Sequence, residues 1–244
     1  MTTSNHNWRK IQLLVFDLDG TLVDSKQDLA LSVNAMREHM GLAPLPLDVV
    51  ASYVGHGVTV LIRRSLGDLA AEANVEKGLD FFLEYYRLHM LDHTGLYPGV
   101  REALDALRGR KLAVLTNKPV RFSTEMLSRL GVAPHFSFIY GGNSFPQKKP
   151  DPIGIRTLMK DLGASPHETL MVGDSDTDVL TGRNAGAWTC GVTYGFGAHT
   201  LQDQPPDLLL ADLRQLPPLL RGETSPGDGS SGPSGPEPRG AHLL

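Results

Sequence analysis

The chain alternates between short apolar runs and longer amphipathic segments. The first apolar run extends from Ile11 to Phe16 and ends abruptly at Asp17, Asp19 and Gly20. A run of about six apolar residues bounded by turn residues predicts a strand that is buried on both faces of a sheet. Similar runs at 112–115, 138–140, 169–172, 188–193 and 207–210 predict further strands.

The segments between these runs have the spacing of helices. We expect helices at 23–40, 100–108, 121–130, 152–162 and 176–186. Asp24 or Ser25 is suited to begin the first of these helices, and Gly41 to end it. Regular alternation of buried strands and helices predicts an α/β protein with a doubly wound, Rossmann-like, mostly parallel sheet.

One interval breaks this alternation. The second strand starts about one hundred residues after the first ends, whereas a strand-helix-strand crossover needs about thirty. The intervening apolar stripes, at 58–66 and 70–91, have helical spacing. We therefore expect an α-helical cap at 25–95 inserted into a core made of 1–24 and 96–221. The Gly-, Ser- and Pro-rich tail at 222–244 is expected to be disordered.

Composition narrows the class of protein. The chain has 244 residues, 41% of them hydrophobic and 20% charged, and a net charge of −4, which gives no reason to expect a nucleic-acid partner. Cys190 is the single cysteine and fits a reducing compartment. The first apolar run is too short for a signal-peptide core or a membrane span, so we expect a cytoplasmic protein that is not bound to a membrane.

Polar side chains follow the expected strands at the points where the strands end. They are Asp17 and Asp19 after the first strand, Thr116 and Asn117 after the second, and Asp174 after the fourth, with Lys149 just before the helix at 152–162. The carboxyl ends of parallel strands lie on one edge of a sheet, so these groups should converge. Neighbouring carboxylates repel unless a proton or cation lies between them, and Mg²⁺ prefers such oxygen ligands.

This set of groups suits a phosphate held against a metal ion. Asp17 and Asp174 are candidate side-chain ligands. Thr116 could donate its hydroxyl and backbone N–H to phosphate, and Asn117 is a further candidate to bind it. Lys149 could neutralise phosphate while restraining Asp17. Each motif alone also has an ordinary structural interpretation as a helix cap, a solvated charge or a turn.

Asp178 has two interpretations. It follows Asp174 by four residues, at the start of the helix expected at 176–186. There it can orient the metal ligands, or it can be the acid that a helix dipole favours in the first turn. Both interpretations can hold together.

Four segments carry a family resemblance: DLDGTLVDS at 17–25, LTNKP at 115–119, KKPDP at 148–152 and GDSDTDV at 173–179. Together with the helical insertion, they resemble the haloacid-dehalogenase superfamily of phosphotransferases with a helical cap. Further segments, including VGHGV at 54–58 and NAG at 184–186, resemble the phosphoglycolate phosphatases of bacteria. The resemblance covers about residues 10–215 and leaves out the tail.

The resemblance implies a magnesium-dependent phosphomonoester hydrolase acting on a small-molecule phosphate ester, in first place 2-phosphoglycolate. Asp17 would be the nucleophile that forms an aspartyl-phosphate, and Asp19 the general acid and base. Magnesium would be held by Asp17, the backbone carbonyl of Asp19, and Asp174. Arg64 or Arg63 is a candidate contact to the substrate carboxylate; the alternative is that both are solvated.

Other activities and other classes of protein are alternatives to this interpretation. A sugar phosphatase, a phosphomutase and a pyrophosphatase would use the same core. Asp19 argues against a dehalogenase, which needs no proton donor there, and 53–66 lacks the lysine that a phosphonate hydrolase would require. A receiver-like signalling domain gathers similar groups but is about half as long. The sequence leaves both a monomer and a homodimer open.

Overall fold

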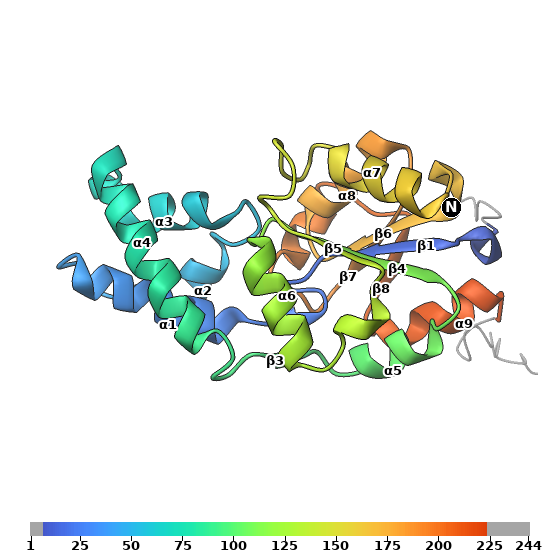
Figure 1. Cartoon of the computed structure of the whole chain (residues 1–244), viewed down its shortest axis with the longest axis horizontal. Coiled ribbons are helices and arrows are strands. Elements are labelled where there is room, and N and C mark those ends of the chain that lie inside the picture. Colours follow the sequence, from blue (N-terminus) through green and yellow to red (C-terminus); the bar gives the residue numbers. More distant parts are fainter. Residues whose placement is uncertain (1–6, 224–244) are drawn as a thin grey trace, which may run out of the picture.

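The computed structural model describes residues 7–223, so the tail predicted at 222–244 lies almost wholly outside the described residues. A parallel six-stranded sheet with the strand order β5-β4-β1-β6-β7-β8 forms the centre (Figure 1). The strands are β1 (Leu13–Phe16), β4 (Lys111–Leu115), β5 (Phe138–Tyr140), β6 (Thr169–Gly173), β7 (Trp188–Val192) and β8 (Leu208–Leu210). No helix in this part of the chain is long and apolar enough to span a bilayer.

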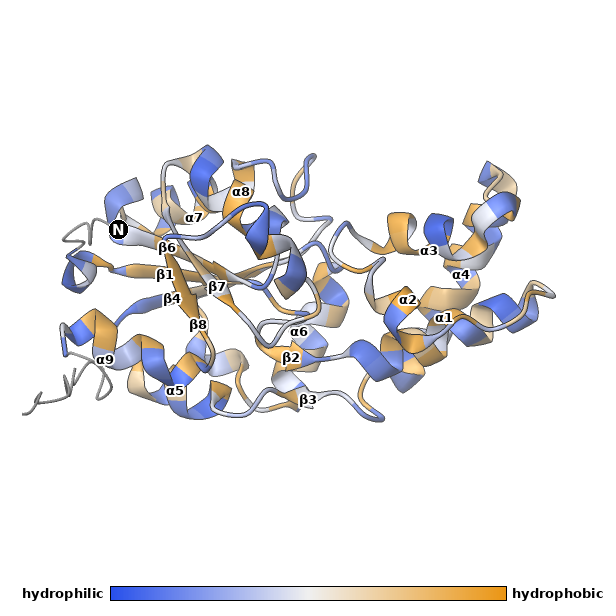
Figure 2. Ribbon diagram, turned by 180° about the vertical axis from the view of Figure 1, so that it is seen from behind, coloured by the Kyte–Doolittle hydropathy of each residue, from blue (hydrophilic) through white to orange (hydrophobic). Residues whose placement is uncertain are grey.

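The first apolar run forms a central strand of the sheet. β1 pairs with β4 on one side and with β6 on the other, and each of its four residues is fully buried. Leu13 and Val15 face one apolar layer, whereas Leu14 and Phe16 face the other, because successive side chains of a strand point to opposite faces. Figure 2 shows the strands of the sheet as largely hydrophobic, as a sheet covered on both faces requires.

Helices cover both faces of the sheet. The helices α7 (Ile153–Leu162) and α8 (Asp176–Ala185) pack on the face of Leu13 and Val15. The helices α5 (Val100–Ala106), α6 (Val120–Arg129) and α9 (Leu216–Arg221) pack on the opposite face (Figure 1). The predicted doubly wound α/β fold is therefore confirmed.

A second group of helices lies beyond the carboxyl end of β1 (Figures 1 and 2). It consists of α1 (Lys26–His39), α2 (Leu47–Ala51), α3 (Val58–Leu66) and α4 (Glu72–His89). Their facing sides bury Val33, Met36, Ile62, Val75 and Phe82. We call this group the helical cap; its assignment to 25–95 as a separate domain stays a prediction that this arrangement supports.

Two short strands connect the cap to the core. β2 (Val23–Asp24) and β3 (Gly95–Leu96) form an antiparallel pair. The predicted helix start at Val23 is therefore wrong: α1 begins at Lys26, after the N-cap Ser25. Residues 23 and 24 are extended because their pairing with 95 and 96 satisfies backbone hydrogen bonds and buries Val23. The spacing of apolar residues along a segment cannot predict this pairing, because its partner is distant in sequence.

Short helical turns complete the described part of the chain. The helix α2 and the 3₁₀ turns were not predicted, because segments this short carry too little periodicity. The 3₁₀ turns are Trp8–Lys10, Gly67–Leu69, Ala133–His135, Pro166–Glu168, Ala198–Gln202 and Leu213–Gln215.

Asp28 ties α1 to the segment that returns from the cap to β3. Its carboxylate is 1% exposed and accepts hydrogen bonds from the backbone N–H groups of His93 and Thr94. The Thr94 hydroxyl donates a further bond of 2.7 Å. A buried carboxylate with this many donors fixes both ends of the cap against each other.

Replacing Asp28 should destabilise the protein. Asp28→Ala leaves buried donors without an acceptor, so we expect the free energy of unfolding to fall by about 1–3 kcal/mol, measured by urea denaturation. Asp28→Asn, which keeps one acceptor oxygen, should lose less. Equal stability of Asp28→Ala and the parent chain would contradict this role for the carboxylate.

Candidate active site

The carboxyl ends of three neighbouring strands meet at the edge of the sheet that faces the cap. Asp17 follows β1, Thr116 follows β4, and Asp174 follows β6. Because β1 lies between β4 and β6, strand pairing brings these side chains together although they are far apart in sequence. Lys149, which precedes α7, is buried at the same place.

Three carboxylates and one ammonium group form a buried cluster. Asp17, Asp174 and Asp178 each offer an oxygen, and these atoms lie within 4.8 Å of one another. The Nζ atom of Lys149 lies 2.8 Å from Asp17 Oδ1 and 2.6 Å from Asp178 Oδ1. All four side chains are buried, and the three carboxylates outnumber the single ammonium.

Burial, together with this surplus charge, disfavours ionisation of the carboxylates. Burial raises the pKa of Asp17 to about 6, against the lowering effect of Lys149. Burial, with the nearby charges of Asp178 and Asp17, raises the pKa of Asp174 to about 8. The cluster by itself is therefore short of positive charge near neutral pH.

The backbone closes tightly around Asp174. Its Oδ2 accepts a 2.8 Å hydrogen bond from Gly197 N, and its Oδ1 accepts one of 3.3 Å from the Thr21 hydroxyl. A Cβ at Gly20 would lie 2.4 Å from Asp174 Oδ2, and one at Gly195 would lie 2.2 Å from Asp174 Cβ. Glycine is required at these two positions for the carboxylate to occupy its place.

Asp178 lies in the first turn of α8 and contacts both the start of that helix and Lys149. Its Oδ2 accepts bonds from the backbone N and hydroxyl of Ser175, the N-cap residue of α8. Its Oδ1 contacts Lys149. One carboxylate thus caps a helix and fixes the ammonium that also contacts Asp17.

A divalent cation fits this cluster. Asp17 Oδ1 is buried and accepts no hydrogen bond from the described residues; its 2.8 Å contact with Lys149 has the distance of an ion pair without hydrogen-bond geometry. Carboxylate oxygens are the ligands that Mg²⁺ prefers. The side chains that would hold it are Asp17 and Asp174, with Asp178 beside them.

Asp19 faces a different set of partners. Its Oδ1 accepts a 2.5 Å bond from the Ser25 hydroxyl. Lys118 Nζ lies 3.0 Å from Oδ1 and 3.2 Å from Oδ2 of the same carboxylate. The same Nζ donates a 2.7 Å bond to the hydroxyl of Tyr86 in the cap helix α4. The side chain of Asp19 therefore points away from the acidic cluster and toward the cap.

Thr116 and Asn117 are placed differently from each other. The backbone N–H of Thr116 donates to Tyr140 O in continuation of the β4–β5 pairing, so the expectation that it is free for phosphate is wrong and only the hydroxyl remains. Asn117 Nδ2 donates to Gly55 O in the cap and to Lys149 O. Its side chain therefore links the cap loop and the Lys149 loop.

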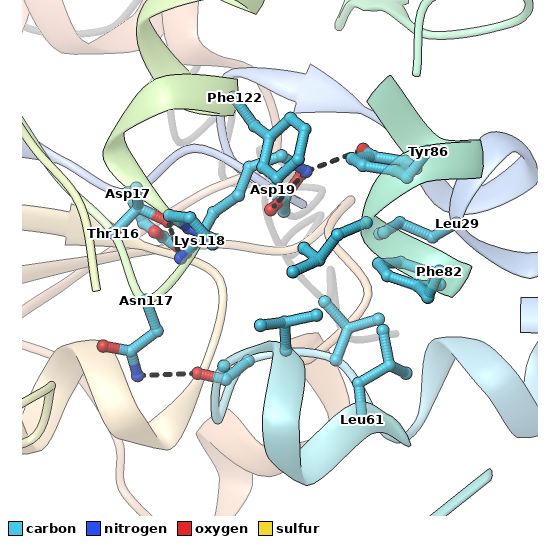
Figure 3. Close-up of a pocket in the computed structure, with 16 residues that line it drawn as sticks. Asp17, Asp19, Leu29, Leu61, Phe82, Tyr86, Thr116, Asn117, Lys118 and Phe122 are labelled. Atoms are coloured by element: carbon cyan, nitrogen blue, oxygen red, sulfur yellow. Dashed lines mark hydrogen bonds and ion pairs between the residues drawn. The ribbon is translucent and has the colours of Figure 1, made fainter. Parts of the chain in front are cut away.

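A cavity lies between these residues and the cap (Figure 3). Asp17, Asp19, Thr116, Asn117 and Lys118 line its core side. The cap side is apolar, with Leu29, Val54, Val58, Leu61, Phe82 and Leu83 next to the Tyr86 ring. The volume in which water molecules can be centred is about 50 Å³, which is enough for a few waters.

The two candidate arginines lie elsewhere. Arg63 and Arg64 are both exposed on α3, whereas Leu61 and Ile62 form its buried side. Arg63 pairs with Glu72 at 2.8 Å, and neither arginine lines the cavity. The structure therefore does not bring Arg64 together with the other predicted site residues.

Sequence reasoning did not single out Lys118 and Tyr86. Lys118 stands in the quoted LTNKP segment, directly after two predicted site residues, and that position was a usable signal. Tyr86 belongs to the apolar stripe of α4, where an aromatic residue that also makes a hydrogen bond to the core has no distinguishing mark in the sequence.

The fold and the carboxylate cluster define a class of protein. The sequence pattern of the family described as haloacid dehalogenase-like hydrolase matches residues 14–192. The chain belongs to this family of hydrolases.

Curated relatives give a more particular comparison. The chain is 42% identical over 222 residues to the phosphoglycolate phosphatase of Chromobacterium violaceum, covering 88% of this chain and 99% of the relative. It is 40% identical over 216 residues to the phosphoglycolate phosphatase of Pseudomonas putida, covering 85% and 79%. Both relatives carry the same name.

A solved structure is also similar. The crystal structure described as a predicted phosphoglycolate phosphatase from Haemophilus somnus has a TM-score of 0.81 and 33% identity, covering 87% of this chain and 97% of that chain. A β-phosphoglucomutase structure from Clostridium difficile, at 19% identity and a TM-score of 0.71, shares the fold.

The charge of the cluster predicts a pH-dependent effect of magnesium on stability. The pKa of Asp174 is raised from 3.8 to about 8, so between these values the metal-free folded state binds more protons than the unfolded chain. Its stability should therefore fall as the pH rises, and a bound divalent cation should cancel the loss. We expect Mg²⁺ to raise the melting temperature more at pH 8 than at pH 5, relative to EDTA.

Two variants control this measurement. Asp174→Asn removes one carboxylate and should shrink the gain from Mg²⁺ at pH 8, whereas Asp203→Asn, at an exposed position, should keep it. An equal gain at both pH values, or an unchanged gain in Asp174→Asn, would contradict a metal site at this cluster.

Proposed function

We propose that this protein is a magnesium-dependent phosphomonoester hydrolase that converts 2-phosphoglycolate to glycolate and phosphate. The observation that carries the proposal is the separation of two carboxylates at one cavity. Asp17 belongs to the cluster of three carboxylates that could bind a cation. Asp19, two residues later, is held toward the cap by Ser25 and Lys118. One suits a nucleophile beside a metal, and the other suits a proton carrier beside the leaving group.

In the first step, Asp17 attacks phosphorus and forms an aspartyl-phosphate while the bond from phosphorus to the ester oxygen breaks. Asp19 gives its proton to that oxygen, so the leaving group departs as a neutral hydroxyl. Lys149, 2.8 Å from Asp17 Oδ1, holds the nucleophile in place and offsets part of the negative charge of the phosphate.

In the second step, a water molecule attacks phosphorus, and the bond from phosphorus to Asp17 breaks. Asp19, now ionised, accepts the proton of that water. Both carboxylates return to their starting states, with phosphate released. We expect the hydroxyl of Thr116, which lines the core side of the cavity, to donate to a phosphate oxygen.

The metal site of this proposal consists of the side chains of Asp17 and Asp174, with the backbone carbonyl of Asp19. When bound, Mg²⁺ would offset the charge of the phosphate and keep Asp17 ionised. Asp178 would hold Lys149 and thereby the orientation of Asp17.

The cavity supports a small substrate. On its cap side Tyr86 is the one polar side chain among the described lining residues, so this side offers few partners for the hydroxyl groups of a sugar. We propose that the helical cap closes over the substrate and excludes water, since α4 and the loop before α3 form the roof. The names of the curated relatives add support for 2-phosphoglycolate. A sugar phosphatase is the second candidate, because the cap could open wider for a larger ester.

A substrate panel tests the reaction and its specificity. We expect the kcat/KM for 2-phosphoglycolate to exceed the values for glucose 6-phosphate and pyrophosphate, and turnover to be lost in EDTA. Asp17→Asn should reduce kcat by about 10³-fold or more, because it removes the nucleophile. Asp48→Asn, at an exposed position on α2, is the matched control. A hexose phosphate ranking first would replace the substrate while keeping the reaction class.

The role of Asp19 has its own test. Asp19→Asn cannot donate a proton, so hydrolysis of 2-phosphoglycolate should slow by about 10²- to 10⁴-fold. 4-Nitrophenyl phosphate has a leaving group that departs without protonation, so formation of the aspartyl-phosphate, seen as a burst of nitrophenolate, should be much less affected. An equal loss of the first step with both substrates would rule out Asp19 as the general acid.

A further inference from the structure

The cavity leaves the carboxylate of a bound substrate with few possible partners. Its cap side is formed by aliphatic and aromatic side chains, and two of its core-side residues, Asp17 and Asp19, are acids. Burying a carboxylate there without a partner would cost far more free energy than a small ligand can gain. A substrate anion in this cavity therefore requires a cation or hydrogen-bond donors in the cavity wall.

Lys118 supplies that cation. Among the described residues that line the cavity, Lys118 is the one with a basic side chain. Its side chain is 5% exposed, and its ammonium lies between Asp19 and Tyr86 at the junction of core and cap (Figure 3). This is the place that the leaving group must reach if Asp19 is to protonate its oxygen.

Tyr86 supplies a donor at the same place. Its hydroxyl accepts the 2.7 Å bond from Lys118, and within 7–223 no acceptor is found for the hydrogen of that hydroxyl. Stacking on Phe82, with ring centroids 5.3 Å apart, and the edge contact with Phe122 at 5.6 Å fix the ring. The hydroxyl is therefore oriented before a ligand arrives, and its hydrogen can point into the cavity.

We propose that the Lys118 ammonium, assisted by the Tyr86 hydroxyl, binds the carboxylate of the substrate and thereby selects phosphate esters of short hydroxy acids. This inference rests on the proposed function and deepens it. In the structure the Lys118 ammonium contacts both carboxylate oxygens of Asp19. The carboxylate of the substrate replaces part of these contacts when it binds. Lys118 thus binds the leaving group next to the position where the ester oxygen is protonated.

The position of Lys118 also explains why the exposed arginines are not needed. Arg64 is exposed on α3 and outside the cavity, so a carboxylate bound there would lie away from Asp19. Lys118 contacts Asp19 directly. In 2-phosphoglycolate a single CH₂ group separates the ester oxygen from the carboxylate, so one anion-binding group must lie next to the proton donor.

The test compares two esters that differ in the carboxylate. 2-Phosphoglycolate and ethyl phosphate both have a CH₂ group on the ester oxygen, but ethyl phosphate has a methyl group in place of the carboxylate. We expect Lys118→Met to lower the ratio of their kcat/KM values, 2-phosphoglycolate over ethyl phosphate, by about 10- to 100-fold, the range of one charge-assisted contact. Tyr86→Phe should lower it less, in the same direction.

Matched variants separate this role from other effects. Lys77→Met, an exposed lysine on α4, should leave the ratio unchanged, and so should Arg64→Met. If Lys118→Met does not fold, as judged by circular dichroism, Lys118→Gln and Tyr86→Phe provide the measurement. An equal loss for both esters in the Lys118 variants would show that Lys118 acts on Asp19 alone and would overturn the inference, as would a selective loss in Arg64→Met.

The outcome for the parent chain distinguishes the two proposals. If the parent chain shows no preference for 2-phosphoglycolate over ethyl phosphate, the substrate proposal fails. If the preference is present and survives in folded Lys118→Met and Tyr86→Phe, the substrate proposal stands and the assignment of Lys118 is overturned.

Discussion

The structure depends on a charge imbalance at the edge of the sheet. Asp17, Asp174 and Asp178 lie around one buried ammonium, Lys149, which contacts Asp17 and Asp178. Burial, together with the neighbouring carboxylates, raises the pKa of Asp17 and Asp174. Buried carboxylates that are not fully neutralised lower the stability of the folded protein. The cluster is consistent with a site whose missing charge comes from a cation and whose free energy is recovered when that cation binds.

The surrounding chain is arranged to hold the cluster in place. Pairing of β1 with β4 and β6 fixes where Asp17 and Asp174 emerge, and Ser175 fixes Asp178 through the cap of α8. Gly20 and Gly195 let the backbone approach Asp174 more closely than any side chain would allow. Strand pairing and backbone packing thus set the geometry, together with the contacts that run from Ser175 through Asp178 and Lys149 to Asp17.

Much of this arrangement could be predicted from the sequence, because it depends on local patterns. Buried runs identified the strands, and the parallel topology brought Asp17, Thr116, Lys149 and Asp174 to one edge. The pairing of Val23 and Asp24 with β3, the hydrogen bond that occupies the Thr116 backbone, and the exposure of Arg64 depend on contacts distant in sequence. Lys118 had a local signal, but its partner Tyr86 came from a cap helix whose orientation no spacing rule determines.

Asn117 and Lys118 are consecutive in the chain, yet they contact two different elements of the cap: Asn117 reaches Gly55 before α3, and Lys118 reaches Tyr86 in α4. The turn after β4 therefore fixes the position of the cap through two hydrogen bonds to different cap elements. A cap transplanted from another protein would keep these two contacts only if it presented a carbonyl and a hydroxyl at the same spacing. One dipeptide of the core thus restricts which caps can dock on it.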